Sequence, residues 1–299
     1  MENTLKILEN CTICPHNCKI DRTAGKIGRC KAKDTVKIAL YSVHNFEEPC
    51  ISGENGSGTV FFSNCNLNCI YCQNYEISQL GRGKEISIRE LADIFCMQQE
   101  KDVENINLVT PTSYVPQIIE AIKIAKDNGL HIPIVYNTNS YENLETLKML
   151  EGYIDIYLPD LKYADNKMAK KYSNINNYFE VATNAIKEMV RQVGTPKFDE
   201  NGKIKKGVII RHLVLPNYVE NSKKVLKWIH ENLPKEVYVS VMAQYFPTYK
   251  AKEDDKINRK LNKEEWQEIL DYIDYLEIEN GYVQELGEHE EEYVPKWEF

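Results

Sequence analysis

The chain has 299 residues, of which 42% are hydrophobic, and it carries a formal net charge of −8 at pH 7. This length suits one large α/β domain or two small ones. No stretch approaches the roughly 18–20 apolar residues of a membrane span, and no secretion signal is recognisable. We therefore expect a cytoplasmic protein that binds no membrane and, given its negative charge, no nucleic acid.

The first cysteines along the chain form an isolated N-terminal group with the pattern C-x2-C-x3-C-x11-C, made by Cys11, Cys14, Cys18 and Cys30. Disulfides are rare in cytoplasmic proteins, so metal binding or simple burial explains the nine cysteines better. Four thiols in twenty residues suit a tetrahedral zinc site or an auxiliary iron–sulfur cluster. Free thiols in a small cap over residues 1–55 are the alternative, and the pattern does not choose the metal.

A polar segment, residues 44–49, precedes the first expected strand and places His44 close to Glu47 and Glu48. A histidine beside carboxylates can serve in acid–base catalysis. A loop that packs the N-terminal cap on the main domain explains the segment equally well, and we favour that interpretation.

The most informative motif follows the first expected strand: Cys65, Cys69 and Cys72 lie in eight residues with the spacing C-x3-C-x2-C. One tight loop with this spacing can direct three thiolates at a single 4Fe–4S cluster. Such a cluster needs four protein ligands to be closed, so three leave one iron open for chemistry. A structural zinc needs a fourth ligand, which the upstream cysteines could supply, so zinc stays an alternative here.

Beyond this loop, short apolar segments rich in β-branched residues alternate with helical patterns. Strands are expected at 58–63, 105–110, 132–137, 154–159, 208–215 and 237–242, with a further one at 282–286. Helices are expected at 87–101, 113–129, 141–150, 164–172, 177–193, 221–233 and 262–279. The clearest helix boundaries are a capping box that begins at Ser87 and a glycine stop at Gly194.

This alternation predicts an α/β fold with a parallel sheet, which is either an open doubly wound sheet or a barrel. No G-x-G-x-x-G motif follows the first strand, so a nicotinamide-binding Rossmann half is disfavoured. Polar residues cluster where the apolar strands stop, as expected for an active site at the carboxyl ends of barrel strands.

The C-x3-C-x2-C loop, with an aromatic residue, Tyr71, just before its last cysteine, resembles the cluster loop of the radical S-adenosylmethionine (radical SAM) superfamily. The resemblance implies a partial (β/α)6 TIM-like barrel over residues 56–299, with a C-terminal helix. It also implies that the open iron of a 4Fe–4S cluster chelates S-adenosylmethionine. An electron then cleaves the sulfonium and produces a 5′-deoxyadenosyl radical.

Two further segments resemble glycyl-radical-enzyme activating enzymes of this superfamily. Residues 159–162 resemble the D-x-K segment after the fourth strand, and residues 137–140 resemble the D-T-N-G segment after the third. On spacing alone, Asp160 and Lys162 are better explained as an ordinary exposed pair at a strand end. The resemblance changes this balance, because the pair would supply both charge signs for a zwitterionic methionine. The resemblance implies cofactor contacts by Tyr71, Asn137, Thr138, Asn139, Asp160 and Lys162, and by the barrel residues Arg211, His212 and Gln244.

The sequence departs from the family pattern at two places. Asn137 replaces an aspartate, and the G-G-E segment usual after the second strand is replaced here by residues 109–112. Thr110 and Thr112 could bind the methionine amino group in its place, or could simply end the strand and cap the next helix. Arg211, His212 and Gln244 could equally be polar barrel residues that bond to their neighbours.

The motifs and the resemblance leave three candidate functions. The first is a radical SAM enzyme, similar to pyruvate formate-lyase activating enzymes, that abstracts a glycine hydrogen from a partner enzyme. The second is a radical SAM enzyme that acts on a small molecule or on another protein. The third is a non-catalytic iron–sulfur or zinc protein. For the first two, the expected partners are S-adenosylmethionine and an electron donor such as flavodoxin or ferredoxin.

Overall fold

A ten-stranded sheet forms the centre of the protein in the computed structural model, which describes residues 4–287 and 297. Its strands lie in the order β10-β9-β8-β6-β5-β4-β2-β1-β3, and β7 pairs with β8. Their bounds are β1 Val36–His44, β2 Ser57–Phe62, β3 Lys84–Ile86, β4 Ile106–Val109, β5 Ile134–Thr138, β6 Ile156–Pro159, β7 Lys197–Phe198, β8 Ile204–Leu213, β9 Tyr238–Met242 and β10 Gly281–Val283.

Six of these strands follow one another in space in the same order as along the chain: β2, β4, β5, β6, β8 and β9. All their pairings are parallel. A doubly wound sheet reverses its strand order at a switch point, and this sheet does not. The order therefore confirms the predicted partial barrel and excludes the open doubly wound alternative.

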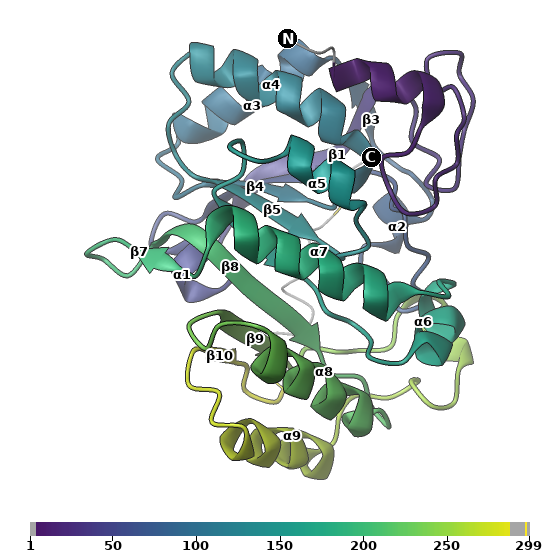
Figure 1. Ribbon diagram of the computed structural model, residues 1–299, viewed down its shortest axis with the longest axis vertical. Helices are drawn as coiled ribbons and strands as arrows, with labels where there is room; N and C mark the ends of the chain where they lie inside the picture. Colours follow the sequence, from purple (N-terminus) through teal and green to yellow (C-terminus); the bar gives the residue numbers. More distant parts are fainter. Residues whose placement is uncertain (1–3, 288–296, 298–299) are drawn as a thin grey trace.

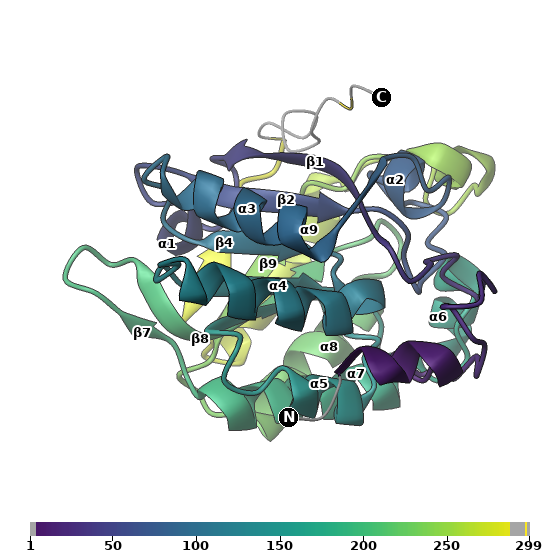
Figure 2. The same ribbon diagram turned by 90° about the horizontal axis from the view of Figure 1, so that it is seen from above.

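The helices lie outside this curved sheet, and Figures 1 and 2 show α3, α4, α7 and α8 covering it. Pairs of helices pack together over the strands, α3 with α4, α5 with α7 and α8 with α9. Their bounds are α1 Pro49–Ser52, α2 Tyr75–Ser78, α3 Ile88–Gln99, α4 Val115–Asp127, α5 Leu144–Met149, α6 Asn166–Ser173, α7 Tyr178–Val193, α8 Val219–Asn232 and α9 Lys263–Tyr275. Three 3₁₀ helices are η1 Thr4–Asn10, η2 Thr112–Tyr114 and η3 Tyr249–Glu253.

The central strands are apolar because both of their faces are covered. Every residue of β2, β4 and β6 is buried. Side chains of these strands pack inward against each other and outward against the helices, which is the burial expected for parallel strands in α/β proteins. Polar groups are thus left for the strand ends, where the candidate site lies.

Each expected strand and helix has a counterpart in the structure, but β1, β3, β7 and the short helices α1 and α2 were not predicted. β1 pairs antiparallel with β2 and with β3 at one edge of the sheet. It lies within the range 1–55 that was expected to form a separate cap, so this range contributes a strand to the main sheet. The cysteine-rich part, residues 4–34, packs outside it and is anchored by the buried Arg22, which donates to the carbonyl oxygens of Lys33 and Ser113.

No helix among residues 4–287 combines the length and the apolar character that crossing a membrane requires.

Candidate active site

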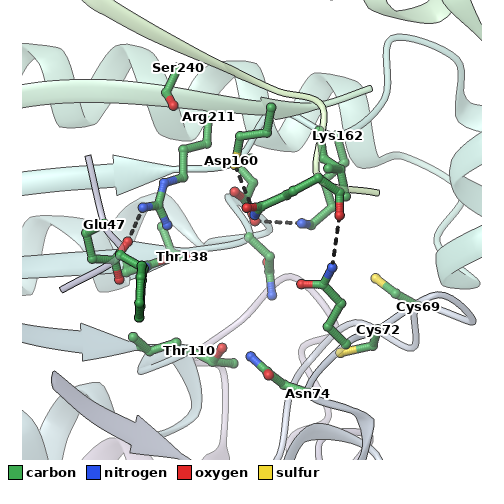
Figure 3. Close-up of a pocket in the computed structure, with 18 of the residues that line it drawn as sticks. Glu47, Cys69, Cys72, Asn74, Thr110, Thr138, Asp160, Lys162, Arg211 and Ser240 are labelled. Atoms are coloured by element: carbon green, nitrogen blue, oxygen red, sulfur yellow. Dashed lines mark hydrogen bonds and ion pairs between the residues drawn. The ribbon is translucent and has the colours of Figure 1, made fainter. Parts of the chain in front are cut away.

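A cavity of about 540 Å³ opens at the carboxyl ends of the barrel strands. Each of the six parallel strands or the loop behind it contributes to the lining, together with the segment before α1 and the segment around β10. Figure 3 shows cysteine side chains on one side of the cavity and charged groups on the other. This is the position at which βα barrels hold their catalytic groups.

The loop after β2 brings Cys65, Cys69 and Cys72 to this cavity. It leaves the strand through Asn64, which has a positive φ of 72° and is fixed by a hydrogen bond from its side chain to the Tyr114 hydroxyl. Asparagine tolerates this left-handed conformation better than most residues. The chain can therefore turn sharply just before the first cysteine.

Each of the three sulfurs has polar neighbours. The Cys65 Sγ accepts hydrogen bonds from the Leu67 backbone N–H and the Asn139 side-chain amide, both at 3.4 Å. The Cys69 Sγ lies 2.9 Å from the Ser173 hydroxyl, and the Cys72 Sγ lies 3.1 Å from the Ser78 hydroxyl. Donors around the sulfurs stabilise thiolate ligands and tune an iron–sulfur cluster.

Burial raises the pKa of all three thiols, to about 11 for Cys69, because a thiolate is poorly solvated there. A bound metal supplies the positive charge that such thiolates need. Within the described residues, no three His, Cys, Asp or Glu side chains converge closely enough for one metal ion. Three thiols on one loop match the ligand set of a 4Fe–4S cluster with one open iron, whereas a structural zinc needs a fourth ligand.

Across the cavity from the cysteines, Asp160 and Lys162 form an ion pair of 2.6 Å directly behind β6 (Figure 3). Burial alone would lower the pKa of Lys162, but the Asp160 carboxylate outweighs it and raises that pKa above its usual value. The two side chains are only 22% and 17% exposed. A fixed carboxylate and ammonium are therefore both available to a zwitterionic ligand.

The end of β5 places Asn137, Thr138 and Asn139 on the cavity wall. Asn139 also donates to Asn66 at 2.8 Å, which ties this strand end to the cysteine loop. Beneath it, the buried Glu142 accepts hydrogen bonds from the hydroxyls of Thr138, Tyr136 and Thr112. Burial raises the pKa of Glu142. This carboxyl group holds the ends of β4 and β5 together.

Arg211 on β8 lines the far side of the cavity, where its guanidinium bonds to Glu47 and to both oxygens of Glu48. Burial alone would lower the pKa of Arg211, but the carboxylates of Glu47 and Glu48 outweigh this effect and raise the pKa above its usual value. His44 lies on the same wall, and burial lowers its pKa. The segment that we interpreted as a packing loop therefore contributes directly to the cavity.

Two further predicted residues line the cavity and two do not. Tyr71 hydrogen-bonds to the Tyr163 hydroxyl, and Gln244 accepts from the Gln284 amide at 3.0 Å. Thr112 is buried and donates to Glu142, as described above. His212 is fully buried; its ring nitrogens face the Leu161 carbonyl oxygen at 2.6 Å and the Ser222 hydroxyl at 2.8 Å. The structure does not bring Thr112 or His212 to the cavity. Thr112 lies in η2, where its hydroxyl is bonded to the buried Glu142. His212 points away because side chains alternate along β8 and Arg211 faces the cavity instead.

The N-terminal cysteine group lies next to the cysteine loop. The His16 ring nitrogen is 2.8 Å from the Asn66 carbonyl oxygen, and Asn143 donates to the Thr12 carbonyl oxygen at 2.9 Å. Cys11 and Cys14 are buried, and burial raises the pKa of Cys14 to about 12. The described part of the chain shows no single-ion arrangement for this group either, so its metal remains a proposal.

Several cavity residues were not identified as site residues from the sequence. They are Gln73, Asn74, Ser240, Gln284 and Glu285, with Glu47 and Glu48 assigned to a packing loop. Gln73 and Asn74 directly follow Cys72, and Ser240 is an isolated polar residue in an apolar strand. Gln73, Asn74 and Ser240 could therefore have been identified as site residues from the sequence. Gln284 and Glu285 could not, because the sequence does not show that β10 lies beside the cavity.

Together these features define a βα-barrel protein whose strand ends present a three-thiol loop and a paired carboxylate and ammonium to one cavity. A family model described as the radical SAM superfamily matches residues 59–229. The chain belongs to this superfamily, and it is a radical SAM enzyme. Membership implies the 4Fe–4S cluster and S-adenosylmethionine that the sequence predicted.

Individual relatives agree with this assignment. The uncharacterised protein MJ0674 of Methanocaldococcus jannaschii is 32% identical over 289 residues, which cover 93% of this chain and 78% of that protein. The pyruvate formate-lyase-activating enzyme of Clostridium pasteurianum is 23% identical, over 64% of this chain and 75% of that enzyme. The crystal structure of Streptococcus suis SuiB bound to precursor peptide SuiA has a TM-score of 0.51 at 19% identity. It matches 77% of this chain, which spans about half (48%) of SuiB, and it supports the fold alone.

Proposed function

We propose that Cys65, Cys69 and Cys72 hold the 4Fe–4S cluster and that the cavity beside them binds S-adenosylmethionine. When bound, the cluster supplies the electron that cleaves the sulfonium to a 5′-deoxyadenosyl radical, which abstracts hydrogen from a substrate. The observation that carries the proposal is the position of the three sulfurs on the same cavity as the Asp160–Lys162 pair.

The chain's own groups have separate tasks in this proposal. Asp160 and Lys162 orient the amino and carboxylate ends of the methionine, and Asn137, Thr138 and Asn139 supply hydrogen bonds at the neighbouring strand end. Thr110 lines the cavity where the family usually has the G-G-E segment, but its side chain offers no carboxylate. Tyr71 and Gln244 complete the wall. Radical transfer requires near contact between reacting atoms, so a rigid wall serves this chemistry.

The test is anaerobic incubation of the reconstituted protein with S-adenosylmethionine and dithionite, followed by quantification of 5′-deoxyadenosine. We expect product from the wild type and from Cys96→Ala, whose half-buried thiol lies on α3 outside the cavity. Cys69→Ala should form none, because the cluster loses one of three ligands. Product formation by Cys69→Ala at the wild-type rate would contradict the proposed cluster ligands.

For the substrate, we propose a glycine residue of a partner enzyme, as in activating enzymes. The support is the resemblance of residues 137–140 and 159–162 to those enzymes and the 23% identity to the clostridial activating enzyme. The direct test is co-incubation with a candidate glycyl radical enzyme and detection of a glycyl radical by electron paramagnetic resonance (EPR). Substituting the acceptor glycine by alanine is the control.

The far wall of the cavity supports a second candidate, a small molecule with a cationic group. Two buried carboxylates, Glu47 and Glu48, face the single guanidinium of Arg211, which leaves one negative charge without a full partner in a poorly solvated wall. If the substrate is a small molecule, formation of 5′-deoxyadenosine should depend on that compound and should need no protein partner. Hydrogen transfer from a labelled amine to 5′-deoxyadenosine would identify this case.

A further inference from the structure

The Cys69 sulfur has the closest polar neighbour of the three sulfurs in the cysteine loop. The Ser173 hydroxyl lies 2.9 Å from it, whereas the donors of the Cys72 and Cys65 sulfurs lie at 3.1 Å and 3.4 Å. Ser173 is fully buried and Cys69 is only 8% exposed, so bulk water does not compete for this contact. A hydroxyl group therefore lies directly against one proposed cluster ligand.

The end of α6 is bonded to the cysteine loop on both sides of Cys69. The Asn68 N–H donates to the carbonyl oxygen of Ser173, the last residue of α6, at 3.3 Å. The Ile70 N–H donates to the Tyr172 carbonyl oxygen at 2.9 Å. The last carbonyl groups of a helix have no partner within the helix, and here the loop supplies two of their donors. These backbone bonds fix Ser173 opposite Cys69.

Two tyrosines continue the contact behind Ser173. The Tyr163 hydroxyl lies 2.7 Å from the Ser173 hydroxyl, and the Tyr71 hydroxyl lies 2.5 Å from the Tyr163 hydroxyl. Both tyrosines are buried. The hydroxyls of Tyr71, Tyr163 and Ser173 thus form one buried series of hydrogen bonds that ends at the Cys69 sulfur. We call this series the hydroxyl chain.

The chemistry of the four groups fixes the direction of every bond in the hydroxyl chain. Each hydroxyl carries one proton, and a cysteine bound to iron is a thiolate that only accepts. Ser173 therefore donates to the Cys69 sulfur, and its oxygen accepts from Tyr163. The Tyr163 oxygen in turn accepts from Tyr71. All three O–H dipoles point towards the sulfur.

The surroundings strengthen this effect. The Tyr178 ring packs edge-on against Tyr163 at 5.3 Å between ring centres, and the Tyr245 ring packs in the same way against Tyr71 at 6.1 Å. These rings enclose the hydroxyl chain in a medium of low polarity. Hydrogen bonds are stronger in such a medium, and successive bonds polarise one another.

The hydroxyl beside the Cys72 sulfur is polarised less. Ser78 accepts from the Gln79 side-chain amide at 3.4 Å, which is long for a bond between nitrogen and oxygen. The Cys65 sulfur accepts from amide N–H groups. We therefore expect the strongest donor effect at Cys69.

We propose that the hydroxyl chain raises the reduction potential of the cluster by donating to the Cys69 sulfur. The proposal rests on the proposed function, because it requires the cluster to be bound at Cys69. Reduction transfers one electron from an external reductant, such as dithionite, to the cluster and its thiolates. The added negative charge strengthens the bond from Ser173, so this bond stabilises the reduced state more than the oxidised state. Tyr163 and Tyr71 are positioning residues that act through Ser173.

The test measures the midpoint potential of the reconstituted holoenzyme before S-adenosylmethionine is added. Dithionite and mediator dyes set the potential, and EPR reports the fraction of reduced cluster. The variants are Ser173→Ala, Tyr163→Phe and the double variant that combines them. The control is Tyr157→Phe, which also removes a buried tyrosine hydroxyl, bonded to Gln192 at 2.6 Å, but on a side chain outside the cavity lining. Iron and sulfide contents are measured for each protein.

Ser173→Ala should shift the equilibrium between the two redox states about tenfold towards the oxidised state, which lowers the potential of this one-electron couple by about 59 mV. Tyr163→Phe should shift it about threefold, because Ser173 still donates but is no longer polarised. The double variant should match Ser173→Ala, since Tyr163 acts only through Ser173. Tyr157→Phe should match the wild type.

Wild-type potentials in both Ser173→Ala and Tyr163→Phe would overturn the proposal, even if their iron contents were lowered, because the hydroxyl chain would then only support the fold. Equal shifts in Tyr163→Phe and Tyr157→Phe would also overturn it. If Ser173→Ala binds no cluster, Tyr163→Phe decides the outcome, because it leaves the donor to Cys69 in place. Absence of a 4Fe–4S signal from the wild type, by contrast, would reject the proposed function itself.

Discussion

Single residues in the cavity wall act mainly through charge pairs. The Asp160–Lys162 pair and the Arg211–Glu47–Glu48 group both line the cavity, and Asp160 and Arg211 are neighbours on adjacent strands. Removing one partner of such a pair leaves the other charge in a poorly solvated position, which costs more than the pair contributes. Substitutions here should therefore lower the free energy of unfolding as well as ligand affinity.

Asp160→Asn should weaken S-adenosylmethionine binding about tenfold, or about 1.4 kcal/mol, because the variant loses the fixed carboxylate while Lys162 keeps its charge. Iron content should stay at the wild-type level, since Asp160 makes no bond to a cysteine sulfur. Anaerobic calorimetric titration measures the affinity. The matched control is Glu145→Gln, which breaks the exposed Lys148–Glu145 pair on α5. Unchanged affinity in Asp160→Asn would remove this residue from the binding site.

His212 makes a prediction about pH. Burial lowers its pKa from 6.5 to about 4, so the folded protein holds the ring neutral while the unfolded chain takes up a proton below pH 6.5. Its contribution to stability is complete above pH 6.5 and is lost as the pH falls towards 4. The loss amounts to about 3 kcal/mol at most.

His212→Gln should therefore show a flatter dependence of the free energy of unfolding on pH than the wild type between these values. Its affinity for S-adenosylmethionine at neutral pH should match that of the wild type, because the ring faces away from the cavity. Urea unfolding at several pH values and calorimetry provide the two measurements. A variant with wild-type pH dependence but impaired binding would place His212 in the site after all.

At the scale of elements, the junction between β4 and η2 is unusual. Thr110 has a φ of 59°, a left-handed conformation that a β-branched residue adopts only at a cost of about 1–2 kcal/mol. Its N–H is held by the Asn137 carbonyl oxygen at 2.9 Å, so the neighbouring strand end enforces the turn. This is the place where the family usually has glycines, which adopt this conformation freely.

Thr110→Gly should stabilise the fold by up to about 1 kcal/mol, because relief of the backbone strain exceeds the entropy that glycine adds to the unfolded chain. Thr112→Gly is the comparison: it should destabilise, since it removes a hydroxyl that bonds to the buried Glu142. Urea denaturation of both variants measures the difference. Equal losses in the two variants would show that Thr110 is not strained.

Most elements were predictable from the sequence because local signals agreed with the fold. The capping box of α3 forms as expected, with Ser87 and Glu90 bonded reciprocally. Apolar runs marked the buried parallel strands. β1 was not predicted because its burial is mixed, and β3 was not predicted because it is an edge strand of only three residues, two of them exposed.

At the scale of the whole molecule, the sequence predicted the barrel and the residues that follow its strands. It could not predict contacts between distant segments. Arg211 meets Glu47 and Glu48, some 163 residues away along the chain, and this pairing turns an apparent packing loop into a cavity wall. Arg211 faces the cavity and His212 faces away from it because side chains alternate along a strand. Predicting which of the two faces the cavity requires the exact register of the strand, which an apolar run does not give.

The central claim concerns the whole site: three sulfurs hold a cluster with one iron left open for S-adenosylmethionine. The most direct measurement is the EPR spectrum of the reduced, reconstituted protein before and after addition of S-adenosylmethionine. We predict a 4Fe–4S signal that changes when the compound is added, in the wild type and in Cys96→Ala but not in Cys69→Ala. A wild-type spectrum that does not respond, or a protein that holds only zinc at this loop, would contradict the account.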